Sequence, residues 1–179
     1  MRAGVSATGS KYRKRAASAG ILKEYKLKPF QFPEDMIVVV DTREQQPIFG
    51  SRPPKGLTIT VSKLDYGDYS LRGFENQFCI ERKKISDLLS YCTVEREKKT
   101  KPKMEQFKRM DWVGLIIEAR ESEVYSPYEH SNISPEAVRQ AIVSFEVRYG
   151  VHVYIGSREN SLRWMVDRMV KYYNIMKEL

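Results

Sequence analysis

Apolar runs in the middle of the chain predict the strands of a sheet. "MIVVVD" (36–41) and "WVGLIIEA" (112–119) are continuous and rich in β-branched residues, which is typical of strands buried on both faces. Shorter segments with alternating or mixed pattern predict the remaining strands at 57–62, 69–73, 77–83 and 151–156. The strand at 77–83, "QFCIERK", begins apolar and ends with three charges, and this change of character needs an explanation.

Helical spacing of apolar residues appears in three later segments. These are "ISDLLSYC", residues 134–149 and a long final helix. The second segment starts at Ser134, a good N-cap, and is followed by Gly150, a good helix stop. The Lys-rich segment 93–111 contains Pro102, which predicts a loop running into a helix that carries Met104 and Phe107. Strands followed by alternating helices and strands predict an α/β fold, a mixed sheet with helices packed on it.

Charge divides the chain into two parts. Of the 179 residues, the first 28 hold eight basic residues and one acid, so most of the net charge of +8 lies there. We expect 1–34 to be a basic, flexible tail and linker, and 35–179 to be the folded domain. The basic cluster Arg13, Lys14 and Arg15 is typical of nucleic-acid binding, although a solubilising extension has the same composition.

Cysteines and hydropathy exclude several classes of protein. Cys79 and Cys92 have no metal-ligand spacing and form no disulfide framework, so we expect core thiols in a reducing compartment. No apolar run approaches 18 residues, so no membrane partner is expected. We expect a cytoplasmic protein in a bacterial or phage-infected cell, or a nuclear one in a eukaryote.

Acidic residues converge at the charged end of 77–83. Glu81 and Lys83 share one face of that strand because they are two residues apart, and Arg82 points to the other face. Asp68 follows a glycine turn and approaches Glu81 if the two strands pair, while Asp41 ends the first apolar strand. Converging carboxylates are costly without a cation, and Mg²⁺ prefers such oxygen ligands. The competing interpretation of Glu81 and Lys83 is a surface ion pair of little value.

Three segments resemble, in order, the core motifs of the XPF-type structure-specific endonucleases. They are "VVVDTRE", "LDYGDYSL" and "CIERKKISDLL", which contain the family signature of Gly-Asp followed by Glu-Arg-Lys-x-x-x-Asp. The resemblance implies a restriction-endonuclease-like fold and cleavage of DNA that depends on Mg²⁺ or Mn²⁺. It also implies a preference for branched or flapped DNA, and a homodimer. The chain resembles the compact, stand-alone members found in bacteria and phages.

The resemblance also implies roles for single residues. Asp68 and Glu81 are expected to bind metal, Asp41 to bind metal or its waters, and Lys83 to act on the attacking water or the phosphate. The expected supporting residues are Arg82, Asp87, Arg43 and Glu44, with Asp87 pairing with Arg82 or Arg43. Further DNA contacts are expected from Arg96, Lys98, Lys99, Lys101 and Lys103. The alternatives are a catalytically silent DNA-binding or scaffold subunit and, more remotely, a basic RNA-binding domain.

Overall fold

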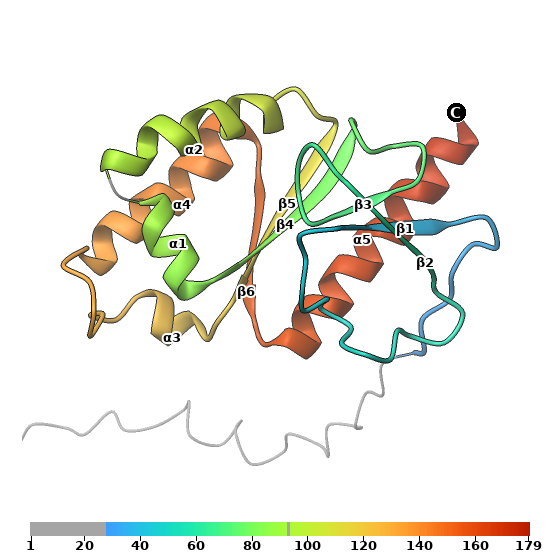
Figure 1. Cartoon of the computed structure of the whole chain (residues 1–179), viewed down its shortest axis with the longest axis horizontal. Coiled ribbons are helices and arrows are strands. Elements are labelled where there is room, and N and C mark those ends of the chain that lie inside the picture. The colour runs from blue at the N-terminus through green and yellow to red at the C-terminus, as the bar shows by residue number, and fades with distance from the viewer. Residues whose placement is uncertain (1–27, 93) are drawn as a thin grey trace, which may run out of the picture.

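A six-stranded mixed sheet with helices on both faces forms the domain (Figure 1). The computed structural model describes residues 28–92 and 94–179, apart from the side chains of 94–97 and 99. The strands are β1 (Ile37–Asp41), β2 (Thr58–Ser62), β3 (Tyr69–Leu71), β4 (Phe78–Lys84), β5 (Trp112–Glu118) and β6 (His152–Gly156). The helices are α1 (Ile85–Tyr91), α2 (Val94–Phe107), α3 (Glu121–Val124), α4 (Pro135–Tyr149) and α5 (Arg158–Glu178). The predicted α/β class is confirmed.

The strand order, β2-β1-β3-β4-β5-β6, determines where chemistry can occur. β3 runs antiparallel to both of its neighbours, β1 and β4, whereas the pairs β1–β2, β4–β5 and β5–β6 are parallel. The carboxyl ends of β1 and β4 therefore lie at the same edge of the sheet as the start of β3. Residues that end β1, precede β3 or occupy the second half of β4 are brought together at this edge.

Each face of the sheet has its own apolar core. One core joins β1, β3 and the start of β4 to α5 through residues such as Tyr69, Ile80 and Met165. The other joins β4 and β5 to α1, α2 and α4 through residues such as Cys79 and Leu115. Figure 1 shows α5 on one side of the sheet and α2 and α4 grouped on the other. No helix in the described part of the chain has the length and apolar character needed to cross a membrane.

The alternation of β4 between these two cores positions its charged residues. Ile80 packs into the core under α5, and Cys79 packs into the core under α1, α2 and α4. Continuing the alternation, Glu81 and Lys83 face α1 and α2, and Arg82 faces α5. The predicted separation of Arg82 from Glu81 and Lys83 is therefore confirmed by the partners that each side chain contacts.

The segment around Pro102 differs from the sequence-based expectation. In place of a loop, α2 runs unbroken from Val94 to Phe107, with Pro102 inside it. Proline removes one helical hydrogen bond, but the Glu-, Lys- and Arg-rich turns before it are strong helix formers and apolar residues after it are packed in the core. The consequence is that residues 102–106 lie on a helix beside the end of β4.

Helix capping in α4 follows the sequence. The Ser134 hydroxyl accepts a hydrogen bond from the Ala137 amide at 3.1 Å, and Gly150 ends the helix with a φ of 69°. A residue with a β-carbon adopts that conformation at a cost, which is why glycine is favoured there. Both predicted boundaries are confirmed.

Candidate active site

Asp68 and Glu81 are brought together by the pairing of β3 with β4. The Asp68 amide donates to the Ile80 carbonyl at 2.9 Å, and the Arg82 amide donates to Oδ2 of Asp68 at 2.7 Å. Gly67 makes this approach feasible, because its φ is +78° and a β-carbon there would lie 2.8 Å from that of Cys79. The Gly-Asp pair is thus the turn that delivers a carboxylate to the middle of β4.

Glu81 is a buried carboxylate with two cationic partners. Its side chain is 1% exposed, and its Oε1 lies 2.6 Å from Nζ of Lys83 and 2.7 Å from Nζ of Lys103. The Tyr91 hydroxyl donates to the same oxygen at 3.1 Å. Burial alone would raise the pKa of Glu81, but the charges of Lys103 and Lys83 outweigh it and hold the pKa below its ordinary value. The alternative of an exposed surface pair is wrong.

The second carboxylate oxygen of Glu81, Oε2, differs from the first in its surroundings. Oε2 is buried and has no hydrogen-bond partner within the described residues. A buried, unpaired carboxylate oxygen is costly and needs an explanation. The partners of this carboxylate all lie on Oε1, so a cation at Oε2 would satisfy the oxygen that they leave unpaired.

Asp68 has the opposite electrostatic environment. Burial and the negative charge of Glu81 raise its pKa from 3.8 to about 6, although the Arg82 amide and the charges of Lys83 and Lys103 oppose the change. Two carboxylates that repel each other are typical of a site built to receive a cation. Lys83, in contrast, is held in the charged form: burial alone would lower its pKa, but the neighbouring Glu81 carboxylate raises it.

These groups face an open pocket of about 530 Å³. Its lining combines the Gly-Asp turn, the end of β4 and the second half of α2: Arg43, Asp65, Tyr66, Gly67, Asp68, Glu81, Lys83, Pro102, Lys103 and Gln106. The pocket therefore contains the predicted acids Asp68 and Glu81 and the predicted cation Lys83.

Asp41 lies near this group but outside the lining of the pocket. Arg43 binds both of its oxygens, with Nε 2.6 Å from Oδ1, and the Leu64 amide donates to Oδ2 at 2.7 Å. Burial alone would raise the pKa of Asp41, but the hydrogen bonds from Arg43 and Leu64 outweigh it and lower the pKa. Among the described residues no three acidic, histidine or cysteine side chains form a ready metal cluster, so the structure does not group Asp41 with Asp68 and Glu81.

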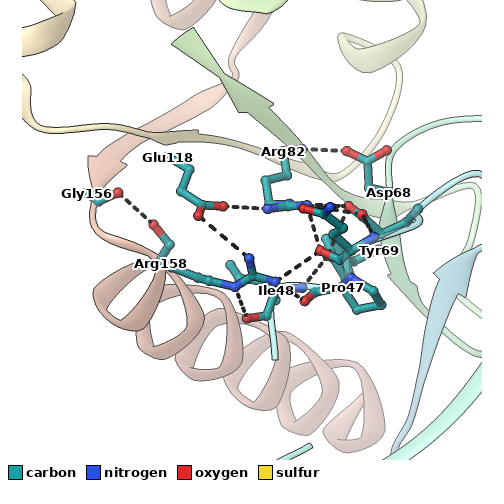
Figure 2. A network of polar contacts seen from close by, with 11 residues as sticks. Pro47, Ile48, Asp68, Tyr69, Arg82, Glu118, Gly156 and Arg158 are labelled. Carbon is teal, nitrogen blue, oxygen red and sulfur yellow. Dashed lines mark hydrogen bonds and ion pairs between the residues drawn. The ribbon is translucent and has the colours of Figure 1, made fainter. Parts of the chain in front are cut away.

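Arg82 forms a separate network on the α5 face (Figure 2). Its guanidinium donates to Glu118 at 2.5 Å, to Glu44 at 3.1 Å and to the Gln46 carbonyl at 2.8 Å. Arg158 of α5 donates to the carbonyls of Gln46, Pro47 and Ile48. Figure 2 shows both arginines around the loop after β1, with the Arg82 amide reaching Asp68. Arg82 and Glu44 are therefore supporting residues that fix this loop against β4 and β5.

Asp87 does not make the expected pair. It is exposed in the first turn of α1, and the acids that bind Arg43 and Arg82 in the described structure are Asp41, Glu44 and Glu118. Asp87 lies in the first turn of α1, where a carboxylate interacts favourably with the helix dipole.

The expected DNA-binding residues fall into three groups. Lys98 and Lys101 are exposed on α2, which suits contact with phosphates. Arg13, Lys14 and Arg15, together with the side chains of Arg96 and Lys99, lie outside the described part of the chain. Lys103 instead binds Glu81 inside the pocket. The position of Lys103 was missed because the lysine run was assigned to a loop, and no signal in the sequence indicated the contact of Tyr91 with Glu81.

The residues present fit a divalent cation. Two carboxylates face one pocket, one of them has an orphaned buried oxygen, and the other is destabilised in its ionised form. Carboxylate oxygens are the ligands preferred by Mg²⁺ and Mn²⁺. Asp68 and Glu81 would hold the ion, with the remaining positions open to water and phosphate.

Comparison with known proteins agrees with these motifs. The family model described as the ERCC4 domain matches residues 40–167. XPF from Aeropyrum pernix has a similar structure, with a TM-score of 0.58 and 17% identity over 77% of this chain and 65% of that one. XPF from Aeropyrum pernix in complex with DNA gives a TM-score of 0.55, with 17% identity over 77% and 64%.

The chain thus spans slightly less than two thirds of these XPF chains. No curated protein sequence matches it. The structural likeness confirms the restriction-endonuclease-like fold predicted from the motifs. Since the family model covers well over half of the sequence, the chain belongs to the ERCC4 domain family.

Proposed function

We propose that this protein is a divalent-metal-dependent DNA endonuclease. The observation that carries the proposal is the orphaned Oε2 of Glu81, buried beside Asp68 in a pocket that also holds a charged lysine. A structural ion pair has no use for an unpartnered oxygen, whereas a metal ligand requires one. The membership of the ERCC4 domain family supports a nuclease.

The roles of the residues follow from their surroundings. A bound Mg²⁺ or Mn²⁺ would polarise the phosphate and lower the pKa of a bound water. Asp68 and Glu81 would supply its carboxylate ligands, and the Arg82 amide orients Asp68 through Oδ2. Lys83 is an ammonium ion in this arrangement, so it stabilises negative charge on the phosphate or orients the attacking water. Asp41 holds Arg43 at the rim of the pocket.

DNA is the substrate that this pocket and its surroundings suit. Arg43, which lines the pocket with a side chain that is 65% exposed, and the exposed Lys98 and Lys101 are suited to contacts with phosphates. The similar XPF structure that contains DNA supports the same partner. Branched or flapped DNA as the preferred form, and a homodimer as the active assembly, remain parts of this proposal.

Cleavage of a labelled DNA panel tests the proposal. Single strand, duplex, 3′ flap, splayed arm and four-way junction are incubated with the protein and Mg²⁺, Mn²⁺ or a chelator. Cutting that requires metal, favours branched DNA and is lost in Asp68→Ala and Lys83→Ala is the expected result. Thermal melting of both variants verifies that they remain folded.

Failure of this test has a specific meaning. Tight DNA binding without cutting under either metal would overturn the nuclease and favour a catalytically silent DNA-binding subunit. Preferential binding of RNA in the same panel would favour the RNA-binding alternative.

A further inference from the structure

Lys103 occupies a place in the pocket that the motif residues do not explain. It comes from α2, one residue after Pro102, and its Nζ lies 2.7 Å from Oε1 of Glu81 and 3.4 Å from the Tyr91 hydroxyl. The ring of Phe107 lies beneath the ammonium, 5.6 Å away at its centroid. These contacts fix the lysine within the site, unlike the exposed Lys101 on the same helix.

The contacts of Glu81 are strongly asymmetric. Oε1 receives Lys83, Lys103 and Tyr91, whereas Oε2 receives no hydrogen bond within the described residues. Three donors on one oxygen fix the orientation of the carboxylate group. One oxygen is therefore used for positioning, and the other is kept available.

The second lysine on Oε1 also matters because Lys83 is proposed to contact both Glu81 and the phosphate. An ammonium that serves the phosphate has to weaken its contact with Oε1 of Glu81, and a metal at Oε2 would not replace that contact. With Lys103 in place, Oε1 keeps a cationic donor when Lys83 turns towards the substrate. This explains why the site has two lysines, although only Lys83 is proposed to act on the phosphate.

We propose that Lys103 is a positioning residue, which holds Oε1 of Glu81 so that Oε2 stays available as a metal ligand and Lys83 is free to serve the phosphate. This inference rests on the proposed metal-dependent nuclease. It differs from a role for Lys103 as one of several lysines that attract DNA, and from the role of a cation that merely neutralises the pocket.

Binding of Mn²⁺ to the full chain without DNA separates these roles. Partners that orient a metal ligand contribute about 10–100-fold to metal affinity. We expect Lys103→Met to weaken Mn²⁺ binding about tenfold, Lys103→Arg to restore most of it, and Lys101→Met to leave it unchanged. A cation that only repels the metal predicts the opposite sign, since its removal strengthens Mn²⁺ binding. Calorimetry or electron paramagnetic resonance of free Mn²⁺ measures the affinities, and thermal melting verifies folding.

Single-turnover cleavage gives the second readout. At saturating DNA, Lys103→Met should cleave at least tenfold more slowly with little change in DNA affinity, whereas Lys101→Met should alter only DNA affinity. Unchanged or tighter Mn²⁺ binding by Lys103→Met, or equal effects of the two lysine variants on DNA affinity alone, would overturn the inference while leaving the nuclease intact. Absence of Mn²⁺ binding by the wild-type protein would instead overturn the metal site and this inference with it.

Discussion

Removing the charge of Asp68 should stabilise the metal-free protein. Burial and, second to it, the negative charge of Glu81 raise the pKa of Asp68 from 3.8 to about 6, so the folded protein retains a proton that the unfolded chain loses near pH 4. Folding therefore loses stability as the pH rises from about 4 to about 6, and the full cost is present at pH 8. Asp68→Asn removes the charge and keeps an oxygen for the Arg82 amide.

The size of the effect follows from the pKa change. A rise from 3.8 to about 6 corresponds to about 3 kcal/mol at 1.4 kcal/mol per pKa unit. Since the amide does not reproduce every contact of the carboxyl group, we expect a gain of about 1–3 kcal/mol at pH 8. For a domain of this length, that raises the melting temperature by about 2–12 °C.

Melting in chelator at pH 8 and at pH 4 measures this gain. Asp68→Asn should melt higher than the wild type at pH 8, and the difference should shrink towards zero at pH 4. Asp65→Asn is the matched control, because Asp65 lines the same pocket but is exposed. Added Mn²⁺ should stabilise the wild type more than Asp68→Asn. A lower melting temperature for Asp68→Asn at pH 8 would refute the reasoning.

Three further changes test other parts of the structure. Gly67→Ala should destabilise the protein by about 2–4 kcal/mol in urea unfolding, because it imposes a strained φ and a contact of 2.8 Å with Cys79; a loss below 0.5 kcal/mol would contradict this. Arg82→Met should cost about 3–5 kcal/mol, since it leaves Glu44 without its cation and Glu118 with only Arg158 at 4.0 Å, and a neutral effect in the same assay would disprove this role of Arg82. Deletion of residues 1–28 should weaken DNA binding and flatten its salt dependence in fluorescence anisotropy, and equal salt slopes would argue against a role for the tail.

Local patterns were sufficient to predict the strands and the pair of acids. The apolar start of β4 and the two-residue spacing of Glu81 and Lys83 determine which side chains share a face. Gly67 indicates a turn, and its turn places Asp68 against the same strand. The motif order then identified the fold, which the structural comparison confirms.

Long-range and context-dependent contacts were not visible in the sequence. Pro102 suggested a break, so the helical placement of Lys103 beside Glu81 was missed. Asp41 was expected to bind the metal or its waters, and the sequence did not show that Arg43, two residues away, binds both of its oxygens. Pattern rules assign a face to a residue, but they do not rank the partners that compete for it.

The opposite orientation of neighbouring residues in β4 has an evolutionary consequence. The arginine clamp that joins Arg82 to Glu44 and Glu118 lies on one face of the sheet, and Glu81 and Lys83 lie on the other. Mutations can therefore erase the reactive face while the clamp continues to hold the loop and the strands together. If Asp68→Asn also increases stability, selection for folding stability alone would favour such a loss. Copies of this domain that do not need the proposed cleavage of DNA should thus drift towards inert, well-folded subunits, and they should lose the acids before they lose the arginine.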